Sequence, residues 1–288
     1  MNMKKFILSA ILIAMFGCSF WSCSSDSAES DPLVEEELQA INDPDEEKAA
    51  ELILYMNEIA PQFPSYAEIT GTKSLRGFFK WLGNVIKCDA FGYVWGLVRG
   101  AGFQGSIVPA VACSIVGAIK LSDDNGMTIK NWTLNPNWNS ITAAFDFQKI
   151  GYDHNKSIYN MYQKNPQLFS KSNSAIISLS ESTLKGMGYS SSLQSIEYNY
   201  LLSTLDISYS QFESNIVNAL RTSAYSSIVS VINEYADNVI NFNDVSQINT
   251  YTNMIYDRID MMGFSKSKEL KAAIAICGNS RILWQEKN

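Results

Sequence analysis

The chain contains a single histidine, His154, and this limits the chemistry that its side chains can perform. A metal centre built from several histidines is excluded, and a serine or cysteine nucleophile activated by histidine must use this one residue. Asp153 precedes it, but none of the serines lies in a Gly-x-Ser-x-Gly context. We interpret His154 and Asn155 as groups that fix the start of a helix. No catalytic residue is predicted, and we do not expect an enzyme.

The other residue types that carry chemistry do not assemble into a recognisable motif either. The glycine pair at Gly100 and Gly102 lacks the third glycine and the preceding strand of a phosphate-binding loop. Acidic pairs at helical spacing, such as Glu234 with Asp237, are usual on solvated helix faces. We therefore predict neither a cofactor nor a metal site. A disulfide is left open among the cysteines beyond the N-terminal region, which show no CxxC spacing: Cys88, Cys113 and Cys277.

The charge of the chain bears on its partners. The formal net charge is −7 at pH 7, and lysine and arginine do not cluster anywhere in the sequence. Non-specific binding to nucleic acids depends on clustered basic side chains that neutralise phosphates. Nucleic acid is therefore excluded as an expected partner.

Small side chains recur at helical spacing between residues 90 and 119. Gly92, Gly96 and Gly100 are four residues apart, and a second series follows a break near Gly105. Residues four apart lie on one face of a helix, so two helices with a stripe of small residues are predicted. We expect a tight helical hairpin over residues 75–120, since glycine stripes allow backbones to approach closely. The second series consists of Ser106, Ala110, Ser114 and Ala118, with Pro109 in the first helical turn.

Two interpretations of this hairpin remain open. The favoured one places it in the buried core of a helical domain. The other makes it membrane-active, because residues 100–119 are 20 residues without a charge, about the length that spans a bilayer. Arg99, Gln104 and Pro109 argue against membrane insertion.

The N-terminal region has the layout of a lipoprotein signal peptide over residues 1–22. Two lysines precede an apolar run from Phe6 to Phe16, and a small residue then precedes a cysteine. Cys23 is the predicted lipidation site, with Cys18 as the alternative, and both contexts resemble bacterial lipobox sequences. Residues 23–42 are acidic and rich in serine, which predicts a flexible, disordered tether. We expect an outer-membrane-anchored lipoprotein of the cell envelope, on the periplasmic face or the cell surface.

Residues 43–288 are predicted to form a single all-α domain. A helix is expected to start at Asp43, and residues 121–150 are expected to be a long connection that Trp132 and Trp138 pin onto the core. Residues 151–288 show repeated helical periodicity, from which we expect about five helices. We expect Asn243 and Asp244 to form a capping turn, either Ser265 or Ser267 to cap the last helix, and Trp284 to lie in that helix. The predicted fold is a multi-helix antiparallel bundle around the central glycine-rich hairpin.

Residues 151–155 read Gly-Tyr-Asp-His-Asn. This segment resembles a Gly-x-x-His-Asn helix start of uncharacterised secreted lipoproteins of Bacteroidota, which also carry an upstream glycine-rich apolar segment. The upstream glycine-rich segment of this chain departs from that pattern, because it has fewer glycines and carries the bulky residues Tyr93, Trp95 and Phe103. The resemblance implies kinship with a family to which no activity is attached.

The sequence thus favours a non-enzymatic helical module that binds another protein or an envelope component, and that reaches the membrane through its N-terminal lipid. The alternative is a membrane-active effector, of the kind used as interbacterial toxins, that acts through the hairpin.

Overall fold

The computed structural model describes residues 43–64, 73–124, 132–140, 143–189, 193–221, 223–242 and 244–286. These residues are predominantly helical, with two short strands, and the helices pack on one another in a multi-helix arrangement. The predicted signal peptide, the tether and the lipidation candidates Cys18 and Cys23 lie outside the described residues.

The helices and strands follow one another in this order along the chain. The first part contains α2 (Glu46–Ile59), η1 (Ala60–Gln62), α4 (Lys73–Val98), α5 (Gly102–Gly105) and α6 (Ile107–Asp124). The expected long connection contains β1 (Trp132–Leu134) and η3 (Trp138–Ser140). The last part contains α7 (Asp146–Lys164), η4 (Leu168–Ser170), α8 (Asn173–Gly186), α9 (Ser195–Asp206), α10 (Tyr209–Arg221), α11 (Ser226–Val239), α12 (Val245–Met262), α13 (Ser267–Leu283) and β2 (Trp284–Glu286).

The described part after residue 145 therefore has seven α-helices, and the expectation of about five was too low. A short break between two helices is difficult to detect from hydrophobic periodicity. Only Ile207 and Ser208 separate α9 from α10.

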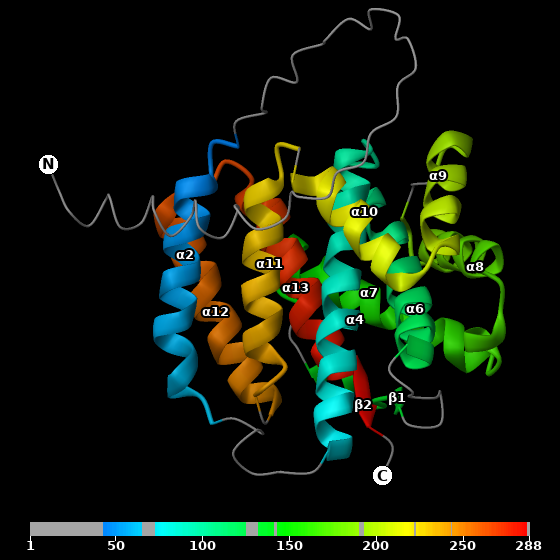
Figure 1. Cartoon of the computed structure of the whole chain (residues 1–288), viewed down its shortest axis with the longest axis horizontal. Helices are drawn as coiled ribbons and strands as arrows, with labels where there is room; N and C mark the ends of the chain where they lie inside the picture. The colour runs from blue at the N-terminus through cyan, green and yellow to red at the C-terminus, as the bar shows by residue number, and fades with distance from the viewer. Residues whose placement is uncertain are drawn as a thin grey trace, which may run out of the picture. The chain divides into compact units, whose positions relative to one another are not determined.

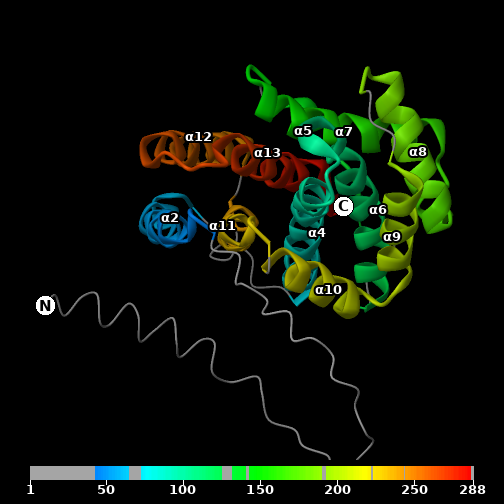
Figure 2. The same ribbon diagram turned by 90° about the horizontal axis from the view of Figure 1, so that it is seen from above.

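Helix α13 lies at the centre of the packing. It contacts α4, α7, α11 and α12, and all but its ends are buried (Figures 1 and 2). Small residues at the contacts allow helices to pack this closely, and Gly151 of α7 is an example. A Cβ atom on Gly151 would lie against the backbone carbonyl of Ala275 in α13, so only glycine lets the two helices approach this closely.

The helix starts illustrate how distant partners alter local preferences. Asp244 caps α12 as predicted, since its carboxylate accepts a hydrogen bond from the backbone N–H of Gln247 at 2.9 Å. Asp43 is not the N-cap of α2, as was predicted, because α2 begins at Glu46 with Asp45 as its N-cap. Oδ1 of Asp43 still accepts a hydrogen bond from the backbone N–H of Asp45 at 3.0 Å, just before the helix. Oδ2 of Asp43 accepts the N–H of Ser227 in α11 at 2.9 Å, which ties the start of α2 to α11.

The cap predicted for the last helix is also wrong. Helix α13 has Lys266 as its N-cap, and neither Ser265 nor Ser267 fills that position. The N–H and the hydroxyl of Ser265 both donate to Asp45 Oδ2, at 2.8 and 2.6 Å. Burial would raise the pKa of Asp45, but these hydrogen bonds and the ammonium of Lys48 outweigh it and lower that pKa. Ser265 therefore stabilises the start of α2, which is 220 residues earlier.

Two tryptophans of the connection are buried against the core, as predicted. Trp132 is 1% exposed and Trp138 is 7% exposed. The Trp132 ring stacks on Trp81 of α4 with centroids 5.2 Å apart, and it meets Trp284 edge-on at 4.9 Å. Trp284 does not belong to the last helix, as was expected, because β2 pairs antiparallel with β1 and places it opposite Leu134. A three-residue ladder is too short to show strand alternation in the sequence.

Candidate functional site

The glycine-rich segment forms the contact between α4 and α6. A Cβ atom on Gly92 would lie 2.8 Å from the Pro109 carbonyl oxygen and 2.9 Å from the Cys113 sulfur. A Cβ atom on Gly96 would lie 2.8 Å from the Cα atom of Ser106. Real Cβ atoms do not approach other atoms so closely, so both positions require glycine for the helices to pack at this distance.

The other residues of the predicted stripes divide into two groups. Ser106, Ala110, Ser114 and Ala118 are all fully buried. Gly100, by contrast, does not extend the stripe of Gly92 and Gly96, because α4 ends at Val98 and Gly100 has φ +83° in the turn that follows. Gly105 is the last residue of α5 and not a turn residue. The turn uses the positive φ of Gly100 and Gly102 instead.

This segment is also the one described helix that is long and apolar enough to cross a membrane, over residues 102–122. Within the fold, 89% of its apolar window is buried against other helices. The segment therefore has a place in the core.

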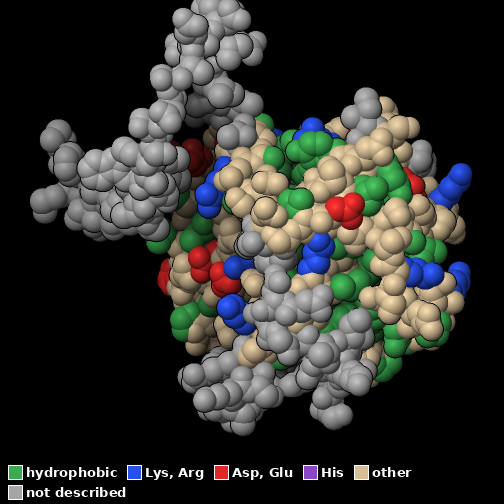
Figure 3. Space-filling view, turned by 45° about the vertical axis from the view of Figure 1, so that its right-hand side comes forward, with side chains coloured by type: hydrophobic (Ala, Val, Ile, Leu, Met, Phe, Trp, Pro, Cys, Tyr) green, Lys and Arg blue, Asp and Glu red, His purple; other side chains and the backbone are tan. Residues whose placement is uncertain are grey.

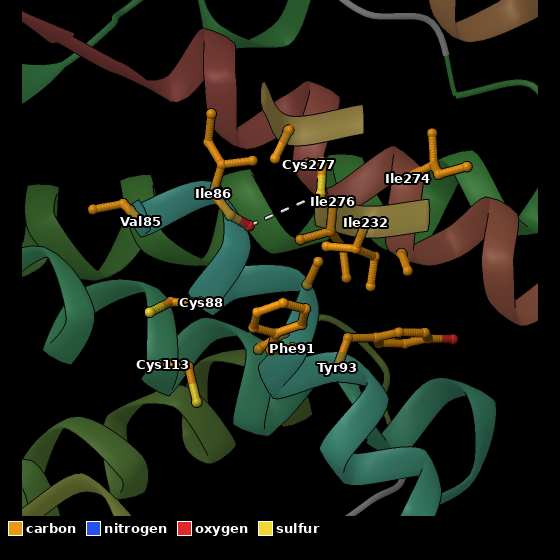
Figure 4. Packing of buried hydrophobic residues seen from close by; sticks show 14 of the residues in the cluster. Val85, Ile86, Cys88, Phe91, Tyr93, Cys113, Ile232, Ile274, Ile276 and Cys277 are labelled. Carbon is orange, nitrogen blue, oxygen red and sulfur yellow. Dashed lines mark hydrogen bonds between the residues drawn. The ribbon is translucent and has the colours of Figure 1, made fainter. Parts of the chain in front are cut away.

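The three described cysteines are buried and unbridged. Cys277 of α13 approaches the backbone carbonyl of Ile86 in α4 at 3.9 Å, and Cys88 and Cys113 lie on α4 and α6 (Figure 4). Burial, with a further effect of Asp89, raises the pKa of both Cys113 and Cys277. Both side chains therefore remain thiols, which are poor nucleophiles.

His154 lies in the middle of α7 and not at its start, which corrects the prediction. The helix begins at Asp146, because the chain of apolar positions from Phe147 and Ile150 continues upstream of the motif. Gly151, His154 and Asn155 share one helix face at spacings of three and four residues. This face packs on α6 and α13, and His154 faces Asp89 of α4, so the Gly-x-x-His-Asn segment is a packing motif in this fold.

The residues opposite His154 form a buried cluster that we call the polar centre: Asp89, Ser114, His154, Asn155, Asn279 and Ser280. Nε2 of His154 lies 3.9 Å from Oδ2 of Asp89, and Nδ1 lies 3.2 Å from Oδ1 of Asn155. The amide of Asn155 donates to the Asn279 carbonyl at 2.7 Å. The Ser280 hydroxyl donates to Asp89 Oδ2. Four helices, α4, α6, α7 and α13, therefore meet at these polar groups.

Burial shifts the pKa values of the two titratable members of the polar centre in opposite directions. Burial raises the pKa of Asp89 well above its usual range, and the hydroxyls of Ser280 and Ser114 offset this only in part. Burial lowers the pKa of His154 to about 4, against the opposing effects of Asn155 and the Ala110 carbonyl. Both shifts favour the uncharged form of the side chain, a protonated carboxyl for Asp89 and a neutral imidazole for His154.

The arrangement contains the residue types of a hydrolase triad but not its geometry. The two ring nitrogens of His154 face Asp89 and Asn155, so neither is hydrogen-bonded to a serine hydroxyl. Every member of the polar centre is at most 2% exposed, and no histidine is visible on the face in Figure 3. Asp153 points elsewhere, toward Lys149 and the Tyr189 hydroxyl. A substrate has no access to these groups.

Asp89 was not identified from the sequence, although a signal existed. It is the only acid between Lys87 and Arg99, inside a segment otherwise free of charge. Within the described residues, no group of three or more histidine, cysteine, aspartate or glutamate side chains has the geometry of a metal site.

The concave surface of this fold lies elsewhere, between the end of α2 and the end of α11. A cavity of about 490 Å³ opens there, which we call the amide cavity. Its polar lining is made of the side-chain amides of Asn57, Gln62, Asn238 and Asn241. Phe63 and Phe242 provide its aromatic wall, together with Ala60, Pro61 and Pro64. No charged side chain is among the described residues that line it.

The comparisons give no relative from which a role could be transferred. No family model matches the chain, and neither a curated protein nor a solved structure matches it.

Proposed function

We propose that this chain is a lipid-anchored protein of the cell envelope whose helical domain is a non-enzymatic binding module. The single observation that carries the proposal is that the titratable side chains of the polar centre are inaccessible to solvent, whereas the accessible cavity is lined by uncharged side chains. Asp89 and His154 are enclosed at the junction of four helices, and burial favours the uncharged form of each. The amide cavity, by contrast, is open to solvent and has a volume within the usual range for small-ligand sites, about 300–1,000 Å³.

The anchor in this proposal is Cys23, with Cys18 as the alternative. The apolar run after Lys4 and Lys5, and the acidic serine-rich segment after Cys23, support this assignment. The lipid would hold the domain at the outer membrane, on its periplasmic face or at the cell surface. Its partner is then an envelope component or another protein.

Site-specific photo-crosslinking in intact cells tests the binding role. A photoreactive residue at position 62, on the rim of the amide cavity, is expected to give a discrete adduct. The matched control is position 160 on α7, where Asn160 lines none of the described cavities. An adduct from position 62 alone would support the proposal. No adduct from positions 57, 62 or 241, in cells that contain the protein at its normal level, would contradict it.

A second function, as a membrane-active effector, has one observation in its favour. The segment over residues 102–122 has the length and composition of a membrane span. Its place in the core makes membrane insertion costly, because α4, α7 and α8 would lose their contacts with α6. Release of trapped dye from lipid vesicles would distinguish the two functions, because only a membrane-active effector should cause it.

A further inference from the structure

The lining of the amide cavity offers hydrogen bonds without offering charge. Neutral primary amides supply both donors and acceptors, which matches ligands whose polar groups are also both donors and acceptors. Hydroxyl groups have this property. An anionic ligand would find no lysine or arginine among the described lining residues.

The internal hydrogen bonds of the cavity determine what a ligand must provide. Nδ2 of Asn238 donates to the Tyr251 hydroxyl at 3.0 Å, and Nδ2 of Asn241 donates to the Asp237 carbonyl at 2.8 Å. In the described part of the chain, neither amide oxygen accepts a hydrogen bond from a protein group. With respect to the described residues, these two oxygens are free to accept hydrogen bonds from a ligand or from water. Gln62 is exposed at the rim and can turn either end of its amide inward.

A half-buried carboxyl outside the cavity is hydrogen-bonded to two of its lining residues. Glu234 accepts hydrogen bonds from the side chains of Asn57 and Asn238. Burial and the neighbouring Asp237 raise the pKa of Glu234. Glu234 is not among the described residues that line the cavity, so a ligand meets amide groups there and not this carboxylate.

The aromatic wall is a rigid, packed cluster. The Phe63 ring lies 5.1 Å from Phe242 and 5.6 Å from Tyr251, and Phe242 meets Tyr251 edge-on at 5.0 Å. Phe63 is half-buried, so part of its ring faces the cavity, whereas Phe242 is 3% exposed. A half-exposed ring on a fixed support offers an apolar surface at little cost in conformational entropy.

We propose that the amide cavity binds a neutral saccharide, whose hydroxyl groups donate to the oxygens of Asn238 and Asn241 and whose C–H face lies on Phe63. This inference rests on the proposed binding function and specifies its ligand class. A purely apolar ligand would displace water from the side-chain oxygens of Asn238 and Asn241 and leave them unpaired, which costs free energy. A saccharide satisfies both the amides and the ring.

Saturation-transfer difference NMR on the full chain, purified in a detergent without a sugar headgroup, tests the proposal. The probes are maltotriose, cellotriose, mannotriose and triacetylchitotriose, and acetyl-trialanine amide serves as a neutral peptide. The variants are Gln62→Leu and Asn241→Leu, with Asn160→Leu as the matched control outside the cavity. Thermal unfolding of each variant establishes that it is folded, and Gln62, being exposed, is the substitution least able to disturb folding.

We expect saturable binding of at least one trisaccharide. Gln62→Leu and Asn241→Leu should each weaken it about fivefold, the effect of one lost hydrogen bond, and Asn160→Leu should leave it unchanged. Absence of binding by all four trisaccharides at about 10 mM overturns the proposal, as does binding that Gln62→Leu does not weaken. Peptide binding that Gln62→Leu weakens, without saccharide binding, overturns the ligand class while preserving the binding function. If no probe binds, the crosslinking at position 62 decides the binding function independently.

Discussion

Oδ2 of Asp89 in α4 and Nε2 of His154 in α7 lie 3.9 Å apart, and neither side chain has any exposed surface. Among the described residues, Oδ1 of Asp89, the Ser114 hydroxyl and Nε2 of His154 have no hydrogen-bond partner at normal distance. Unpaired buried polar groups destabilise a fold unless water satisfies them. The polar centre therefore lowers the stability of the fold, and its titratable groups make that stability depend on pH.

The first prediction concerns His154. Its pKa is about 4 in the folded chain against 6.5 as the ordinary value, so the unfolded chain binds a proton first. Its contribution to stability is complete above 6.5 and is lost as the pH falls toward 4. The loss should be about 2 kcal/mol at about pH 5 relative to about pH 7.5.

Urea denaturation of the wild type and of His154→Leu at the two pH values isolates this contribution. The difference in unfolding free energy between the two proteins should change by that amount, because the contributions of other groups cancel. A difference that is the same at both pH values would mean that folding does not shift the pKa of His154.

The second prediction concerns Asp89, whose contribution to stability changes with pH in the opposite direction to that of His154. The pKa of Asp89 is raised in the folded chain, so the folded chain keeps a proton that the unfolded chain loses above about pH 4. Stability is therefore lost as the pH rises from there toward the folded pKa. Asp89→Asn keeps the shape and removes the titration, so the variant should gain stability relative to the wild type as the pH rises above about 4. A relative loss as the pH rises, measured by urea denaturation, would show that Asp89 is ionised inside the fold.

The third prediction compares two glycines of α4. Gly92→Ala places a methyl group against Pro109 and Cys113 and should destabilise the fold by about 1–3 kcal/mol. A Cβ atom added at Gly77 would have no described atom within 4 Å beyond the neighbouring backbone of its own helix. Gly77→Ala should therefore stabilise the fold by about 0.5–1 kcal/mol. Thermal unfolding of both variants measures the contrast. Equal effects of the same sign would mean that α4 and α6 do not approach as closely as described.

The fourth prediction concerns the anchor. Cys23→Ala should abolish the incorporation of labelled palmitate, and Cys18→Ala should leave it unchanged. Since both cysteines follow the same apolar run, only the position of processing distinguishes them. The reverse pattern would place the lipid on Cys18.

Local patterns predicted much of this fold, because they report local geometry. The spacing of Gly92 and Gly96 indicated a close helix contact, and the structure places these residues against Ser106, Pro109 and Cys113. The cap positions predicted at Asp43 and Ser265 were wrong for the opposite reason. Asp43 binds Ser227 as well as the nearby Asp45 N–H, and Ser265 binds Asp45, so each has a partner more than 180 residues away that no local pattern records.

The polar centre could not have been predicted for the same reason. Asp89 and His154 are 65 residues apart in the sequence. The motif around His154 is typical of a helix start, but α7 begins upstream of it at Asp146. The amide cavity is less predictable still. Asn57 and Asn241 are ordinary polar residues near helix ends, and only the packing of α2 beside α11 brings them together.

The central claim is that the segment from α4 to α6 is the core of a binding module and not a membrane device. Dye release from lipid vesicles tests it most directly, with the chain lacking residues 1–22 and carrying Cys23→Ala. We predict that this protein stays in the supernatant and releases no dye, since the segment over residues 102–122 remains packed against other helices. Dye release by this protein that disappears in Gly96→Leu, with that variant still folded by circular dichroism, would contradict the claim.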